Sequence, residues 1–254
     1  MTTFPSNPSV ERANASLIAA RTAIFSPSQR PGKSGWSEWI ETPYGKVRKS
    51  GRLGQRHQDL LEAMLYHNLA RARTKDKRVH LLVDPHDIRM ALGSHYSHEQ
   101  IQVLIKELTE AVVEVKAGEF HAMGHLVDTV VWSDKHLLAN PIARERGRKL
   151  WRVTLGAVGS ALVTDDILLT RDPAPIAALD HGIAQAVARW CLSHKDQPKG
   201  GWRIDCVLNA LCVPHGKPAR DARYRLRASA EGLARLGLTI ENDRITKTTQ
   251  KSQE

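Results

Sequence analysis

"GKPARDARYRLRASAEGLARLGLTIENDRITK", residues 216–247, carries the strongest pattern in the chain. Helical periodicity places Ala222, Leu226 and Leu233 on one apolar face. The opposite face carries a set of polar side chains that is almost entirely basic: Arg220, Arg223, Tyr224 and Arg227. The pattern predicts an amphipathic helix whose exposed face is positively charged, especially near its N-terminal end.

Two interpretations fit this helix when it is taken alone. A basic face can simply be solvated, or it can bind phosphate. Basic residues near a helix N-terminus oppose the helix dipole, whereas the dipole and the free N–H groups there attract anions. In a helix-turn-helix, the first residues of the second helix enter the major groove, where arginine reads guanine. Lys217 and Tyr224 suit phosphate contacts.

The segment after this helix favours the second interpretation. Residues 238–247 alternate about Asn242 and Asp243, a pattern typical of a tight hairpin. That hairpin carries two further basic side chains. The predicted DNA-binding residues are therefore Lys217, Arg220, Arg223, Tyr224, Arg227, Arg244 and Lys247.

The composition points to a polyanionic partner. The chain has 254 residues, of which 41% are hydrophobic and 25% charged, with a net charge of +10. These fractions are ordinary for globular proteins, and the charge favours nucleic acid or an anionic surface. We find neither an apolar run long enough to cross a membrane nor a signal peptide, so we expect a cytoplasmic protein with no membrane partner. Three cysteines in apolar settings predict buried free thiols.

The charge is unevenly distributed. Residues 44–78 carry ten basic and three acidic side chains, residues 79–131 three basic and eight acidic, and residues 217–251 nine basic and four acidic. The first basic block includes Lys46, Arg48, Lys49, Arg52 and Arg56. A solvated hairpin and a set of DNA-backbone contacts both remain open for this block.

The first half of the chain shows a recurring order of elements. Its pattern predicts a hairpin over 36–51, a helix over 55–73, a strand over 78–84, a helix that starts at Asp84 and ends at Gly93, a helix within 97–115 that starts after Ser97, and strands over 112–118 and 124–134 with a loop between them. Ser97 and Gln100 form a capping-box pattern. The exposed face of the 97–115 helix is acidic on balance, so we expect this half to serve in packing, dimer contacts or partner binding.

The second half repeats that order. We predict a long helix over 176–195, a strand over 201–205 that ends on Asp205 as a helix cap, a short helix stopped by Pro214, the basic helix and the hairpin. Both halves then follow the plan of a winged helix. The predicted fold class is α+β with two tandem winged-helix domains. The predicted limits are 1–35 for a flexible arm, 36–155 and 156–247 for the two domains, and 248–254 for a tail.

No catalytic pattern accompanies this plan. "PGKSG" (31–35) lacks the earlier glycine of a phosphate loop, because position 27 is Pro27. The twelve histidines come with no CxxC or HExxH spacing. The paired histidines of rolling-circle nucleases are also absent. We therefore predict that the protein is not an enzyme and has neither a metal nor a cofactor; a DNA-nicking or metal-dependent enzyme is the contrary hypothesis.

The chain resembles plasmid replication initiators with two winged-helix domains, the iteron-binding initiators of broad-host-range plasmids. The resemblance covers about residues 20–247 and is densest in "KLWRVTLGAVGSALV", in "ILLTRDPAPIAALDHGIAQAVARWCLSHK", in the "WRID" segment and in "RYRLRASAEGLARLGLTIE". Leu238 stands where the family usually has a tryptophan before the wing. "ARTAIFSPSQR" (20–30) resembles the family's N-terminal segment.

The resemblance implies a function and partners. Such proteins bind direct repeats at a plasmid origin through the second winged helix, promote opening of the duplex, and recruit host replication proteins such as the helicase or its loader. Many form homodimers and repress their own promoter. The expected function is therefore a sequence-specific initiator of plasmid replication. The alternative is a winged-helix repressor that binds an inverted-repeat operator.

Overall fold

Helix α2 (Gln55–Tyr66) lies at the centre of the larger of two hydrophobic cores. The structure is a computed structural model and describes residues 14–33, 35–132 and 149–248. Leu60, Ala63 and Met64 of α2 are fully buried. Nearly every side of this helix is covered, so its buried residues include polar and charged ones such as His57, Asp59 and Glu62 beside the apolar stripe.

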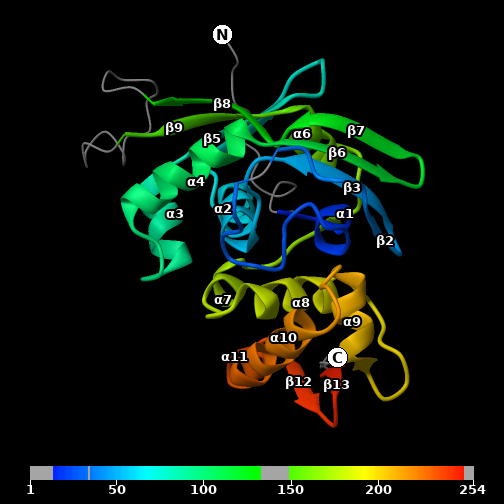
Figure 1. The fold of residues 1–254 in the computed structure, drawn as a ribbon. Coiled ribbons are helices and arrows are strands. Elements are labelled where there is room, and N and C mark those ends of the chain that lie inside the picture. Colours follow the sequence, from blue (N-terminus) through cyan, green and yellow to red (C-terminus); the bar gives the residue numbers. More distant parts are fainter. Residues whose placement is uncertain (1–13, 34, 133–148, 249–254) are drawn as a thin grey trace, which may run out of the picture.

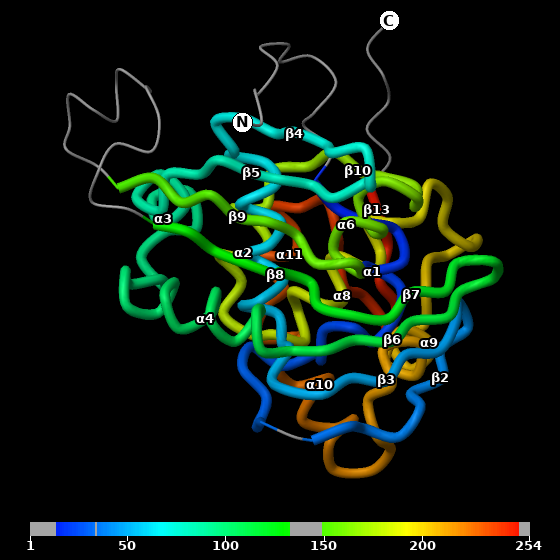
Figure 2. Tube along the Cα trace, turned by 90° about the horizontal axis from the view of Figure 1, so that it is seen from above, coloured from blue at the N-terminus to red at the C-terminus, as the bar shows by residue number. Residues whose placement is uncertain are grey.

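Two antiparallel sheets enclose α2 together with several helices. This part comprises β1 (Ala15–Ser16), α1 (Leu17–Arg21), β2 (Ile40–Thr42), β3 (Gly45–Ser50), α2, β4 (Ala70–Arg73), β5 (Val79–Val83), α3 (Pro85–Leu92), α4 (His98–Glu110), β6 (Val112–Ala117), β7 (Phe120–His125), β8 (Val127–Trp132), β9 (Trp151–Leu155), α6 (Ala157–Thr164) and β10 (Leu168–Leu169). The strand orders are β2–β3–β6–β7 and β4–β5–β9–β8. Seen from above, β5, β9 and β8 run side by side over α2 (Figure 2).

The second core lies below the first in Figure 1. It comprises α7 (Ala174–Ala177), α8 (Gly182–Leu192), β11 (Trp202–Arg203), α9 (Ile204–Ala210), α10 (Lys217–Ala228), α11 (Ala230–Arg235), β12 (Leu238–Glu241) and β13 (Arg244–Lys247). The three strands form an antiparallel sheet of order β11–β13–β12. Trp190, Trp202, Leu226 and Ile245 are among the buried side chains that join helices to sheet.

The α+β part of the predicted fold class is confirmed, and the sheets are antiparallel. Several local predictions are confirmed as well. Asp84 caps α3 by accepting from the His86 backbone N–H at 2.9 Å, and Gly93 ends that helix at a φ of +83°. Ser97 and Gln100 form the reciprocal capping box of α4. These signals are local, so they depend little on the rest of the fold.

One helix of the first half is shorter than predicted. The helix expected over 55–73 ends at Tyr66, and residues 70–73 form β4 instead, because their alternating pattern pairs with β5. Leu69, which the helical pattern included, is exposed. The helix expected within 97–115 ends at Glu110, and the strand predicted over 112–118 is confirmed as β6. Part of the expected loop before residue 124 is strand β7.

Two predictions for the second half also differ from the structure. The long helix predicted over 176–195 is broken between α7 and α8, and the chain there approaches the N-terminal segment, where Gln29 donates to the Asp180 carbonyl at 2.7 Å. Asp205 is not a helix cap as predicted, because Arg203 takes the N-cap position of α9. Asp205 lies in the first turn of that helix, and its carboxylate accepts a hydrogen bond from Arg223 of α10.

The described part of the predicted N-terminal arm is packed and not free. Ile24 and Phe25 are buried in the first core, so residues 14–33 belong to that domain. The boundary predicted at 155–156 also differs from the division of the cores. Side chains of α6 lie in the first core, and the two cores meet at Ile176 and Ala177. Residues 1–13, 34 and 249–254 lie outside the described residues, as do 133–148.

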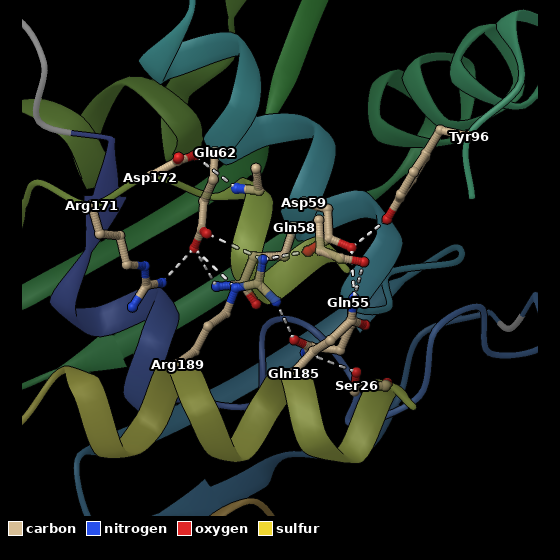
Figure 3. Close-up of polar contacts among 12 residues, drawn as sticks. Ser26, Gln55, Gln58, Asp59, Glu62, Tyr96, Arg171, Asp172, Gln185 and Arg189 are labelled. Carbon is tan, nitrogen blue, oxygen red and sulfur yellow. Dashed lines mark hydrogen bonds and ion pairs between the residues drawn. The ribbon is translucent and has the colours of Figure 1, made fainter. Parts of the chain in front are cut away.

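A buried ionic network joins the two parts (Figure 3). Arg189 of α8 donates to Asp59 Oδ1 at 2.5 Å and to Glu62 Oε1 at 3.1 Å, and Arg171 donates to Glu62 Oε1 at 2.8 Å. Tyr96 donates its hydroxyl to Asp59. Burial raises the pKa of Asp59, whereas Arg171 and Arg189 outweigh burial and lower the pKa of Glu62. The network holds α8 against α2 by paired charges that water does not reach.

Candidate nucleic-acid interface

Helix α10 lies on the second core by its apolar face. Ala219, Ala222 and Leu226 are buried, as the periodicity of the sequence predicted. The helix ends at Ala228, and a turn at Ser229 leads into the short helix α11, where Leu233 is again buried. The predicted apolar face is therefore confirmed, but it is divided between two helices.

The start of α10 has no side-chain cap. Its N-cap is Gly216, with a φ of +81°, and Pro218 stands in the first turn. The first turn contains no acidic residue, and Lys217 is exposed. The free N–H groups of this turn, together with the helix dipole, make the end of the helix attractive to an anion.

The outward side chains of α10 fall into two groups. Lys217, Arg220 and Tyr224 are exposed, and none of them has an ion pair or side-chain hydrogen bond within the described residues. Tyr224 is 75% exposed, the most exposed large hydrophobic side chain among the described residues. These three groups are free to meet a ligand without breaking an internal interaction.

Arg223 and Arg227 are each held by a carboxylate from a neighbouring element. Arg223 donates to Asp205 Oδ1 from Nε at 3.0 Å and also from Nη2. Arg227 donates from Nη2 to Asp243 Oδ1 at 2.6 Å. The first pair joins α10 to α9, and the second joins α10 to the turn between β12 and β13.

The hairpin β12–β13 forms as predicted. Asn242 and Asp243 both have positive φ values, 48° and 57°, as a two-residue hairpin turn of this kind requires. Arg244 is exposed and donates from Nη1 to the Gly200 and Gly201 carbonyls, at 3.3 Å each. Lys247 donates from Nζ to the His194 carbonyl at 3.0 Å, so its ammonium is turned toward the loop after α8.

The structure thus gathers five of the seven predicted residues around α10 and leaves the last two at the sheet. Asp205 and Asp243 complete the surface, although the sequence interpretation assigned them only to a cap and a turn. The available signal was the excess of arginine on α10, because guanidinium groups at a helix surface commonly take a nearby carboxylate as a partner. Which acid would reach them depends on the tertiary packing of α9 and β12–β13.

Most of the basic block of the first half is engaged within the protein, although Arg73 and Lys75 are exposed and have no partner among the described residues. Lys49 is buried, and its ammonium donates to the Ala23 and Ile24 carbonyls at 2.8 Å each and to Ser26 Oγ at 3.1 Å. Burial lowers the pKa of Lys49 to about 7. Other members of the block have partners of their own: Arg48 pairs with Glu114, Arg52 with Glu107, and Lys46 and Arg56 lie over the rings of Trp39 and Tyr96.

The acidic residues of α4 hold the N-terminal segment. Glu107 accepts from Arg30 at 2.8 Å and from His57 at 2.9 Å, and Glu110 accepts from Lys33 at 2.9 Å. Burial alone would raise the pKa of Glu107, but the hydrogen bonds from Arg30 and His57 lower it. Glu107 and Glu110 of α4 are therefore held in ion pairs with the N-terminal segment, whereas Lys217 and Arg220 of α10 have no partner among the described residues.

Three further predictions concern metal ligands, thiols and membrane spans. Within residues 14–33, 35–132 and 149–248, no three histidine, cysteine, aspartate or glutamate side chains gather as metal ligands. All three cysteines are free, but only Cys191 is buried as predicted, while Cys206 is exposed and Cys212 half-buried. Among the described residues no helix is long and apolar enough to cross a membrane.

Comparison of the chain with known protein families, with curated proteins and with solved structures gives no match.

Proposed function

We propose that the protein binds double-stranded DNA sequence-specifically through a winged helix formed by residues 182–248. In this proposal α9 and α10 are the two helices of a helix-turn-helix, α10 enters the major groove, and β12–β13 is the wing. The elements α2, α3, α4 and β6–β7 form the first winged helix of the pair.

One observation carries the proposal: α10 buries its apolar face and presents basic side chains at an uncapped N-terminus. Lys217 and Arg220 reach solvent there without an internal partner among the described residues. Cations that have no internal partner gain most from phosphate, because binding releases counterions from the DNA and breaks no interaction within the protein. Tyr224 adds an exposed hydroxyl for the backbone.

The biological role that we propose is initiation of plasmid replication. The motifs at 149–163, 167–195 and 223–241 support it by their resemblance to iteron-binding initiators. The protein would bind direct repeats at the origin, promote opening of the adjacent duplex, and engage a host helicase or its loader. Binding and DNA deformation suffice for this role, so no catalytic residue is required.

The first test removes the outward arginines together. In the Arg220→Ala, Arg223→Ala, Arg227→Ala variant, the affinity for a duplex with tandem origin repeats should fall at least a hundredfold at 0.15 M salt. The slope of log K against log salt should decrease by about 0.9 for each phosphate that an arginine no longer neutralises. Arg235→Ala is the matched control, because Arg235 is an exposed arginine paired only with Glu231 on α11. Unchanged affinity and slope in the triple variant would refute the proposal.

A footprint on plasmid DNA separates the initiator from the repressor. Protection of several tandem repeats beside the reading frame supports an initiator. Protection of one inverted repeat over a promoter supports a repressor, which binds such half-sites as a dimer. Cleavage of supercoiled origin DNA by the purified protein, abolished by a point substitution, would instead support the enzymatic hypothesis.

A further inference from the structure

The pair of Arg223 and Asp205 has a geometry that differs from the other ion pairs on α10. Arg223 donates from both Nε and Nη2 to the same oxygen, Oδ1, of Asp205. The interaction therefore uses one whole edge of the guanidinium and not a single nitrogen. Arg227, by contrast, reaches Asp243 through Nη2 alone.

This interaction leaves the other edge of Arg223 free. A guanidinium has five N–H donors in a rigid plane. With the Nε edge held, one donor on Nη1 and one on Nη2 still point away from Asp205, and Nη1 has no partner among the described residues. Two parallel donors on one edge match O6 and N7 of guanine in the major groove.

The carboxylate also fixes the direction in which that edge points. An arginine side chain loses considerable rotamer freedom when it is ordered, which weakens binding by a flexible arginine. Asp205 lies in the first turn of α9, whose backbone packs against α10, so it orders Arg223 before any ligand arrives. The Arg223 side chain is 32% exposed and that of Asp205 50%, so the pair is supported by the protein and still open to solvent.

The position of Asp205 on a DNA-binding surface is otherwise unfavourable. A half-exposed carboxylate facing the duplex is repelled by the phosphates, and removing it would strengthen non-specific binding. Because this repulsion weakens DNA binding, we expect Asp205 to act on the sequence specificity of binding and not on its affinity.

We propose that Asp205 is a specificity-determining residue, which holds Arg223 so that its free edge reads one guanine of the DNA site. The inference rests on the proposed function, because it assigns roles within the same surface. Arg220, which has no carboxylate partner among the described residues, then serves as a phosphate contact.

The experiment begins with selection of bound duplexes from a randomised library by the full-length wild-type protein. The enriched sequence should contain one guanine whose replacement weakens binding about five- to 150-fold. Arg223→Ala and Arg223→Lys should both abolish that preference, the latter because lysine keeps the charge but lacks the planar fork. Arg220→Ala should weaken binding to all sequences about equally and lower the salt slope by about 1.

The decisive variant is Asp205→Ala. It should relax the preference at the same guanine that Arg223→Ala affects, while affinity for random duplex stays equal or increases. The guanine preference of Asp205→Asn should lie between those of the wild-type protein and Asp205→Ala, because the amide oxygen can still accept a weaker hydrogen bond from Arg223. Glu231→Ala, which frees Arg235 on α11, is the matched control and should leave the preference unchanged. Thermal unfolding of each variant verifies that it is folded.

The possible failures are distinguishable. If Asp205→Ala keeps the guanine preference, or weakens binding equally for all sequences, the role of Asp205 is wrong and the DNA-binding function stands. If the folded wild-type protein enriches no sequence, the proposed function itself is wrong.

Discussion

Helices α4 and α10 follow the same order of elements but have opposite surfaces. Each helix comes after a short helix and before an antiparallel hairpin, β6–β7 for α4 and β12–β13 for α10, although the short helix α11 separates α10 from its hairpin. Helix α4 carries one lysine and three glutamates and begins with a complete capping box. Helix α10 carries five basic residues and one acid and has no side-chain cap. One arrangement of elements therefore supports an anion-repelling helix in the first half and an anion-attracting helix in the second.

The two halves also use their basic residues differently. In the first half, cations such as Arg48, Lys49 and Arg52 are held by carboxylates or carbonyls of the same half. In the second half, Lys217 and Arg220 have no such partner among the described residues. A count of charges along the sequence cannot distinguish an engaged cation from a free one. The comparison teaches that most cations of the block at 44–78 are engaged within the protein, whereas Lys217 and Arg220 of the second half have no partner among the described residues.

The largest expected effect comes from the junction between the halves. Arg189→Met removes the cation that neutralises Asp59 and Glu62 and leaves two carboxylates buried with Arg171 alone. The free energy of unfolding should fall by about 3–5 kcal/mol, as measured by urea denaturation at pH 7. Arg235→Met breaks an exposed pair and should change it by less than about 0.5 kcal/mol. A decrease below about 1 kcal/mol for Arg189→Met would show that the network does not hold the halves together.

The second effect concerns the buried cation of the first half. Burial lowers the pKa of Lys49 from 10.5 to about 7, so the unfolded chain binds more protons than the folded chain between these values. Protonation of the buried Lys49 amine destabilises the folded state. The free energy of unfolding therefore rises with pH in this range and decreases as the pH falls toward 7. From pH 7 to pH 9, the free energy of unfolding should increase by about 2 kcal/mol relative to Lys49→Met. Parallel pH profiles for the two proteins would contradict this expectation.

Most of the predicted caps and tight turns are confirmed, with Asp205 as the exception. Asp84, Ser97 and the Asn242–Asp243 turn were predicted correctly, because such features depend on neighbours a few positions away. The apolar face of α10 followed from periodicity for the same reason.

Long-range contacts explain the errors. Residues 70–73 form a strand because they pair with β5. The break before α8 depends on contact with the packed N-terminal segment. The pairing of Asp205 with Arg223 and the burial of Lys49 depend on elements brought together by the fold. Periodicity records which face of an element is buried, but it does not record which charged side chain meets which. The basic surface could therefore be predicted, whereas the acids that order it could not.

The smallest expected effect tests the contrast between the two helices directly. Glu99 and Val103 are exposed on α4, and replacing both with arginine would give α4 a basic face like that of α10. Stability should fall by less than about 1 kcal/mol, since the substitutions are on the surface and mainly oppose the helix dipole. Affinity for random duplex should increase less than tenfold, with a steeper salt slope, as measured by fluorescence anisotropy.

Two controls sharpen the meaning of that result. Glu99→Ala removes the negative charge and adds no cation, so it should reproduce only a small part of the increase. The sequence preference should not change in either variant, because Arg223 and Asp205 remain intact on the other half. If the arginine variant instead acquired a new sequence preference, α4 would already lie in a groove of the DNA. The two helices would then differ in charge alone, and not in their position on the duplex.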